Sequence, residues 1–87
     1  MKPVFVMIKC NPGQAYRVAG QAVEKISNIS EIYSISGAYD LMAKFYLEDE
    51  TDTGRFVTEQ VQTLSGVADT FTVITFNAFT VPQHGKK

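Results

Sequence analysis

The chain is built from one unit of about 38 residues used twice. At an offset of 38 positions, residues 28–35 align with residues 66–73, and five of the eight aligned pairs match in chemical type. The same offset places Val23 on Val61 and Ile26 on Leu64. With 87 residues the chain has room for one small domain only, so both copies of the unit must belong to a single fold.

The first unit reads as strand, helix, strand. Residues 4–10 form an apolar run rich in β-branched side chains and too short for a buried helix. Asn11 followed by Pro12 predicts a helix start, with Asn11 as N-cap and Pro12 in the first helical position. Residues 31–36 are the predicted second strand. The helix between them carries one apolar stripe, made of Ala15, Val18, Ala19, Ala22, Val23 and Ile26.

The second unit repeats this pattern. Residues 41–47 are the third strand, and an acidic run at 48–52 leads into a helix predicted near 51–65, where negative charge favours the helix start. Gly66 is placed to end that helix in a left-handed C-cap. The buried face of this helix is expected to be Phe56, Val57, Val61 and Leu64. The fourth strand starts near Val67 and alternates through Phe71, Val73, Thr75, Asn77, Phe79 and Val81.

The order βαββαβ with right-handed crossovers predicts an α+β fold, the ferredoxin-like sandwich. It has a four-stranded antiparallel sheet with two helices on one face. The strands nevertheless carry apolar residues on both faces, such as Phe45 against Tyr46 and Val73 against Ile74. Because a wetted sheet face is normally polar, we expect a homodimer formed through the sheet. The folded domain is expected over residues 1–82, followed by a polar tail at 83–87.

Composition excludes several classes of function. The single cysteine, Cys10, excludes an internal disulfide and a Cys-rich metal site. The single histidine, His84, lies near the chain end, which argues against a Ser/His/Asp triad or a multi-His zinc site. Without Lys86 and Lys87 there are six basic against nine acidic residues, and the basic ones are scattered. We therefore expect no direct binding to nucleic acid, no metal and no cofactor. No apolar run is long enough to cross a membrane and no signal peptide is visible, so a cytoplasmic location is expected.

Three segments together resemble a known family. They are Asn-Pro-Gly at 11–13, Ile-x-Glu-Ile-Tyr-x-Ile-x-Gly-Ala-Tyr-Asp-Leu-Met-Ala-Lys at 29–44, and Leu-Ser-Gly-Val-x-x-Thr-x-Thr at 64–72. They resemble the effector-sensing RAM domain of the leucine-responsive/asparagine-type (Lrp/AsnC) transcriptional regulators, over residues 4–76.

The resemblance implies an amino-acid sensor that assembles. Family members form dimers that assemble further into rings of eight or ten subunits, and amino acids bind at the junction between dimers. Family regulators also carry an N-terminal helix-turn-helix domain. Since the chain starts at the first strand of the sensor, we expect it to be similar to stand-alone members that lack the DNA reader, with a full-length family regulator as a candidate partner.

The resemblance also indicates candidate effector-binding residues. In the family, the loop matching Ser36, Gly37, Ala38, Tyr39 and Asp40 lies at the effector site, and the Thr-x-Thr position matches Thr70 and Thr72. Paired donors and acceptors of this kind suit a zwitterion. The plainer interpretations are a β-turn at 37–40, with Asp40 capping it, and ordinary strand threonines at 70 and 72.

Other candidate sites have structural explanations. The acidic run at 48–52 lacks the spacing of a calcium loop and fits a solvated helix start. Cys10 reads as an unreactive thiol at a strand end, and His84 lies in the polar tail. No catalytic residue and no metal ligand is therefore predicted.

Three functions remain open on these grounds. The leading one is a non-enzymatic amino-acid sensor whose ligand modulates oligomerisation or a partner regulator. The alternatives are a small dimeric α+β-barrel enzyme of the monooxygenase or isomerase type, and an assembly module without a ligand. For the sensor we expect Asp40→Ala to weaken ligand binding without unfolding the domain.

Overall fold

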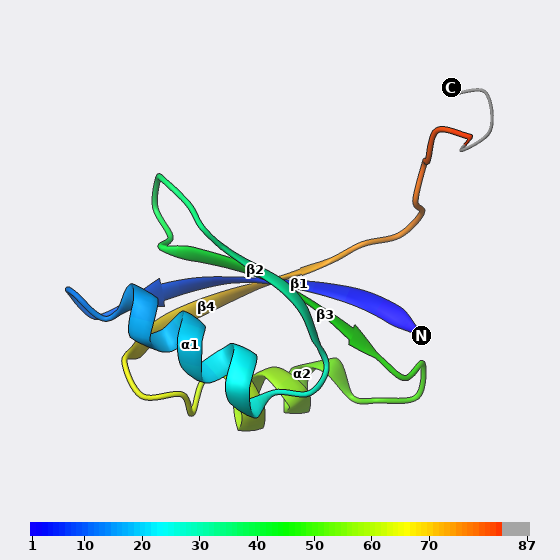
Figure 1. Ribbon diagram of the computed structural model, residues 1–87. Helices are drawn as coiled ribbons and strands as arrows, with labels where there is room; N and C mark the ends of the chain where they lie inside the picture. Colours follow the sequence, from blue (N-terminus) through cyan, green and yellow to red (C-terminus); the bar gives the residue numbers. More distant parts are fainter. Residues whose placement is uncertain (83–87) are drawn as a thin grey trace.

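The fold is a four-stranded antiparallel sheet with both helical segments on one face (Figure 1). The computed structural model describes residues 1–82; the predicted tail at 83–87, with His84, lies outside the described residues. Two strands flank the first helix: β1 (Lys2–Cys10), α1 (Ala15–Lys25) and β2 (Ile29–Ser34). The second half consists of β3 (Leu41–Leu47), α2 (Thr53–Phe56), the π-helical turn η1 (Val57–Val61) and β4 (Val67–Ile74).

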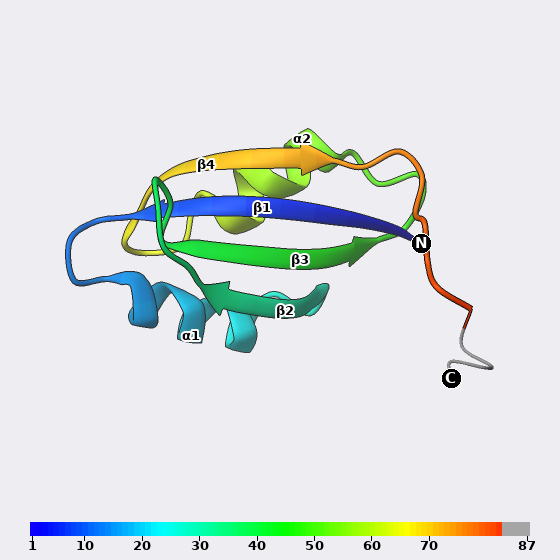
Figure 2. The same cartoon turned by 90° about the horizontal axis from the view of Figure 1, so that it is seen from above.

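The strand order is β2-β3-β1-β4, which the view onto the sheet shows directly (Figure 2). This order and the βαββαβ sequence confirm the predicted ferredoxin-like α+β fold. The two central strands run side by side from Lys2 opposite Leu47 to Ile8 opposite Leu41. β3 has the predicted bounds, whereas β1 begins two residues earlier and β2 lies two residues earlier than predicted.

The start of the first helix was predicted wrongly. Pro12 is not the first helical residue, because a turn intervenes: the Gln14 N–H donates to the Asn11 carbonyl at 3.0 Å, and Gly13 has φ +78°. A proline followed by a glycine with positive φ is the signature of a type II turn. The helix therefore begins at Ala15, and its N-cap Gln14 makes no side-chain capping hydrogen bond.

The second helical segment lies within the predicted range but is shorter and irregular. Asp52 is its N-cap, where Oδ1 accepts from the Arg55 N–H at 3.0 Å. The Gln62 N–H then donates to the Val57 carbonyl at 2.9 Å, which is the five-residue spacing of a π-helix. Gly66 has the predicted left-handed conformation, with φ +100°, but it does not end the helix as predicted, because the helical segment ends at Val61 with Gln62 as its C-cap.

One hydrophobic core lies between the sheet and the helices. All four predicted residues of the second helical segment are buried, as are the even-numbered residues of β1 from Val4 to Cys10 and the odd-numbered residues of β3. Phe45 is fully buried and packs edge-on against Phe56, with ring centroids 5.1 Å apart. In the α1 stripe one prediction was wrong: Val23 is 62% exposed, because it lies at the margin of the face that Val18 and Ala22 bury.

Within residues 1–82, no helix or strand covers the opposite face of the sheet (Figure 1). We call it the open face; Phe71 and Tyr33 lie on it and are 54% and 52% exposed. Lys44 lies there between two aromatic rings, 5.7 Å from the centroid of Phe5 and 5.0 Å from that of Tyr46. A hydrogen bond with Tyr46 is the main cause that raises the pKa of Lys44. The face is thus largely aromatic and apolar, but Lys44 is paired there with Glu31, whose negative charge also raises the pKa of Lys44.

Across residues 1–82, none of the helices is both long enough and apolar enough to pass through a membrane.

Candidate functional site

The loop between β2 and β3 is closed by two backbone hydrogen bonds. The Ile35 N–H donates to the Asp40 carbonyl at 3.0 Å, and the Asp40 N–H donates to the Ile8 carbonyl at 2.9 Å. Gly37 sits inside the loop at φ +105°, a conformation that other residues rarely adopt. Four of the predicted site residues, Ser36, Gly37, Ala38 and Tyr39, therefore lie in a closed loop anchored to the end of β1.

The Asp40 carboxylate is fixed against the end of β1. Its Oδ2 accepts from the Cys10 N–H at 2.8 Å. The carboxylate therefore caps a neighbouring strand and not the turn of its own loop. Burial is the main cause that raises the pKa of the Cys10 thiol, and the charge of Asp40 adds to it.

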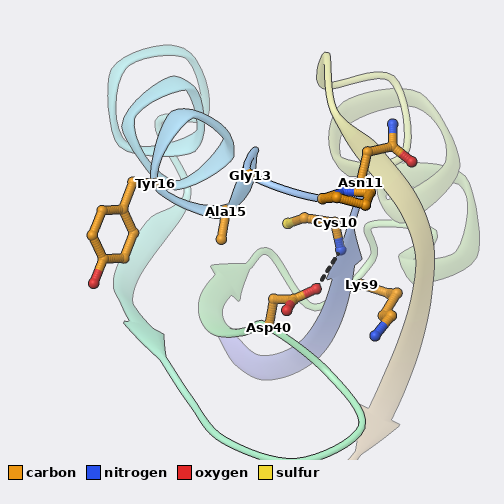
Figure 3. Close-up of a pocket in the computed structure, with 8 residues that line it drawn as sticks. Lys9, Cys10, Asn11, Gly13, Ala15, Tyr16 and Asp40 are labelled. Carbon is orange, nitrogen blue, oxygen red and sulfur yellow. Dashed lines mark hydrogen bonds between the residues drawn. The ribbon is translucent and has the colours of Figure 1, made fainter.

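A cleft of about 450 Å³ opens beside Asp40 (Figure 3). Figure 3 shows Asp40 between the end of β1, which carries Lys9 and Cys10, and the first turn of α1, which carries Ala15 and Tyr16. The Asp40 carboxylate borders the cleft, and Lys9 lines it from the end of β1. The residues that line the cleft are Lys9, Cys10, Asn11, Pro12, Gly13, Ala15, Tyr16 and Asp40.

Tyr39 lies on a different surface from its neighbour Asp40. Its ring stacks on Phe71 of β4, with centroids 6.1 Å apart and planes inclined by 23°. Phe71 pairs with Met7 on the open face of the sheet. The loop thus contacts the cleft through Asp40 and the open face through Tyr39.

Thr70 and Thr72 lie on the side of the sheet that the helices cover. They pair with Ile8 and Val6, two buried residues of β1, and paired residues of an antiparallel ladder point to the same face. Thr70 Oγ1 accepts from Gln62 Nε2 at 2.8 Å. Within one copy, the threonines and the ring of Tyr39 are therefore on opposite faces of the sheet, and the structure does not bring the two predicted groups together.

Sequence reasoning missed most of the cleft. Lys9 and Tyr16 were not predicted as site residues. In the structure both line the cleft, and Tyr16 is 81% exposed. The available signal was the Pro-Gly dipeptide at 12–13, which marks a turn. With a turn there, β1 and α1 meet at an angle and leave a space, whereas a helix starting at Pro12 would have filled it.

No metal centre is found in the described part of the chain. Residues 1–82 contain no group of three or more His, Cys, Asp and Glu side chains placed to hold an ion.

Sequence comparison identifies relatives of this chain. The family described as the Lrp/AsnC ligand binding domain matches residues 3–81. An uncharacterized HTH-type transcriptional regulator of Pyrococcus abyssi is 28% identical over 75 residues, which cover 84% of this chain and 50% of the relative. One from Pyrococcus horikoshii is 26% identical over 74 residues, 83% of this chain and 49% of that protein. The chain spans about half the length of the curated relatives it matches.

Solved structures agree with the sequence matches. TTHA0845 from Thermus thermophilus superposes with a TM-score of 0.80 at 31% identity, covering 93% of this chain and 100% of that one. AsnC of E. coli has a TM-score of 0.77 at 19% identity, covering 92% of this chain and 54% of AsnC. The regulator NMB0573 of Neisseria meningitidis, solved in complex with L-Met, has a TM-score of 0.78 at 14% identity, covering 94% of this chain and 54% of that protein.

The last two structures share the fold at low identity, whereas the family match extends over nearly all of the sequence. Together with the βαββαβ sandwich and the loop that ends in Asp40, this match shows that the chain belongs to the Lrp/AsnC ligand-binding domain family of transcriptional regulators.

Proposed function

We propose that this domain is a non-enzymatic sensor that binds a free amino acid in the cleft beside Asp40, with binding linked to the assembly of several copies. The observation that carries the proposal is the cleft itself, in which a fixed carboxylate and a helix N-terminus border one space of about 450 Å³ that Lys9 also lines. That volume suits a small ligand. The L-Met complex of the Neisseria regulator offers a precedent within the same fold.

The chemistry of the cleft matches the two charged groups of an amino acid. The Asp40 carboxylate, held by the Cys10 N–H, is a fixed acceptor for an α-ammonium. The first-turn N–H groups of α1 are donors for an α-carboxylate, because the N-cap Gln14 leaves that helix end without a side-chain cap. Lys9 adds a positive charge near the end of β1. Tyr16 borders the cleft as an aromatic surface for the ligand side chain.

Residues from more than one copy are needed for the complete predicted site. Thr70 and Thr72 lie on the helix side of the sheet, whereas the ring of Tyr39 lies on the open face. We infer that one ligand meets both groups only when a neighbouring copy supplies the second. This supports a site at the junction between dimers, in an octameric or decameric ring, and a full-length family regulator is a partner with which such a ring could co-assemble.

The dimer within such a ring would form through the open face. Half-exposed rings of Tyr33 and Phe71 lie there with Val73, and a second copy packed on them would remove this apolar surface from water. A domain of 87 residues gains from the added burial, because small domains bury too little surface alone.

Thermal unfolding with each of the twenty amino acids at millimolar concentration tests the sensor. A ligand at about 100 times its dissociation constant stabilises the folded state by roughly 2.7 kcal/mol, several degrees for a domain of this size. We expect one amino acid or a few related ones to raise the melting temperature. If none does, the sensor proposal fails and an assembly module without a ligand replaces it.

Asp40→Asn then tests the role of the carboxylate, with Glu24→Gln on the exposed face of α1 as matched control. Asparagine retains an oxygen that accepts from the Cys10 N–H, so the fold is kept while the charge is removed. Isothermal titration should show at least a tenfold loss of affinity in Asp40→Asn and none in Glu24→Gln. Equal affinity in the two variants would exclude Asp40 from the site.

A further inference from the structure

The segment that follows β4 is rich in exposed apolar side chains. We call residues 75–82 the C-terminal arm. Pairing between β1 and β4 ends at Val4 and Ile74, so within residues 1–82 the arm continues the strand without a paired neighbour. Phe76, Phe79 and Val81 in it are 94%, 93% and 75% exposed.

The arm leaves the domain on the side of the open face. Figure 1 shows it in orange to red, rising from the sheet away from α1 and α2, and Figure 2 shows that it passes the end of the sheet near the N-terminus. Where it departs, a cavity of about 340 Å³ lies between arm and sheet. The sheet side of this cavity is Pro3, Phe5, Lys44 and Tyr46, and the arm side is Thr75, Asn77, Ala78 and Thr80.

We propose that the C-terminal arm packs on a second copy of the chain, so that each copy of a dimer gives its arm to the other. This inference rests on the proposed dimer and adds to it the segment that holds the two copies together. Two features indicate that the arm packs on a second copy. The arm leaves the domain on the side of the open face, and it continues β4, whose Phe71 and Val73 belong to that face.

The area that the arm offers fits what a dimer requires. A fully buried Phe removes about 150–250 Å² from water, and the two arm rings are more than nine-tenths exposed. Together they supply roughly 300–450 Å², about half of the roughly 800 Å² that each partner contributes to a stable interface. The half-exposed rings of Tyr33 and Phe71 on the open face supply much of the remainder.

The reach of the arm also fits. Packed sheets lie about 10 Å apart, and eight extended residues span roughly 26 Å at about 3.3 Å each. The arm can therefore cross from its own sheet to the partner's and still have several residues to lie along it. Two-fold symmetry makes the exchange reciprocal and closed, so it ends at two copies.

The affinity test compares full-length variants by sedimentation equilibrium. The double variant Phe76→Ser/Phe79→Ser should raise the dimer dissociation constant about tenfold or more, while Val23→Ser, which removes an exposed apolar side chain from α1, should leave it unchanged. Because both phenylalanines are more than nine-tenths exposed, the double variant keeps the fold of one copy, which circular dichroism checks. An unchanged dissociation constant in the double variant overturns the inference.

A crosslinking experiment locates the arm. Phe79→p-benzoylphenylalanine is prepared in ¹⁵N-labelled and unlabelled form, the two are mixed, and crosslinked peptides are identified by mass spectrometry. Crosslinks between labelled and unlabelled chains that join the arm to strand peptides support the exchange. Crosslinks only within one chain, in a protein that sedimentation shows to be dimeric, overturn the exchange and leave the proposed dimer standing. A wild-type protein that is monomeric at all concentrations overturns the dimer itself.

Discussion

The Asp40 carboxylate accepts a hydrogen bond from the backbone N–H of Cys10, thirty positions earlier in the chain, at 2.8 Å. This bond joins the loop between β2 and β3 to the end of β1, beyond the strand positions that pair with β3. It gives Asp40 a structural task in addition to the proposed ligand contact. Substitutions at Asp40 must therefore be chosen to separate the two.

Asp40→Ala should destabilise the domain, whereas Asp40→Asn should not. Alanine leaves the part-buried Cys10 N–H without its acceptor, which costs about 1–3 kcal/mol, while asparagine still offers an oxygen there. Urea denaturation at one fixed protein concentration measures both free energies of unfolding. Equal stability of the two variants would show that the hydrogen bond contributes nothing. The prediction from sequence, that Asp40→Ala weakens ligand binding without unfolding the domain, stays a prediction, and this loss of stability is expected beside it.

The Cys10 thiol should make the domain less stable at high pH. Burial and the charge of Asp40 raise its pKa above the ordinary 9.0, so the folded state holds the proton more tightly than the unfolded state does. The resulting stabilisation is fully present below the pKa that the Cys10 thiol has in the unfolded chain. It is lost as the pH rises through the higher pKa that the thiol has in the folded protein. Unfolding free energies of the wild type and Cys10→Ala, measured from about pH 7 to about pH 11, should converge or cross toward the upper end. A difference that is constant over this range would contradict the shift. Alkylation by iodoacetamide should likewise be slower in the folded than in the unfolded protein at the same pH, because the raised pKa lowers the thiolate fraction and the thiol is buried.

Two glycines should respond to alanine with opposite signs. A Cβ on Gly66 would lie 3.0 Å from both Gln14 Cβ and Val18 Cγ2, and its φ of +100° is unfavourable for alanine. Gly66→Ala should therefore lower stability by more than about 1 kcal/mol. Gly20 lies inside α1, and an added methyl group there would have nothing within 4 Å, so Gly20→Ala should raise stability by roughly 0.5–1 kcal/mol. Thermal melts of both variants beside the wild type check the pair, and two shifts of the same sign would be the contrary result.

Asp52 should be a genuine N-cap for the second helical segment. Its Oδ1 accepts from the Arg55 N–H at 3.0 Å, and Asp52→Ala should cost about 0.5–2 kcal/mol. Asp52→Asn and Asp52→Ser should retain most of that stability, since both side chains cap well. Chemical denaturation of the three variants ranks them. If alanine ranks with asparagine and serine, the cap is not a stabilising interaction.

The fold was largely predictable from the sequence because its signals are local and repeated. The repeat, the alternation in β3 and the stripe on the second helical segment each depend on one element facing one core, so burial follows from periodicity. Val23 was predicted as buried for the same reason, but the stripe is wider than the surface available beneath α1.

The candidate site was less predictable because it depends on where distant segments meet. The sequence marked Asp40, but its partner Cys10 and the cleft residues Lys9 and Tyr16 follow from how β1, α1 and the loop are arranged. The Pro12–Gly13 turn decides that arrangement, and a Pro at 12 fits either a helix start or a turn by propensity alone. The proposed contribution of Thr70 and Thr72 to a site would require a second copy, which no pattern within one chain can position.

Tyr39 and Asp40 are successive residues that belong to two surfaces, the open face and the cleft. A single peptide unit joins them, so a ligand that moved the backbone at Asp40 would act one residue from the ring that rests on Phe71. Binding of a small molecule in the cleft and docking of a second copy on the open face would thus be coupled, positively or negatively, through the loop that carries Tyr39 and Asp40. By thermodynamic reciprocity, ligand binding changes the free energy of dimerisation by the same amount as dimerisation changes the free energy of ligand binding. The dimer dissociation constant, measured with and without ligand, would therefore report the same coupling as the ligand affinities of monomer and dimer.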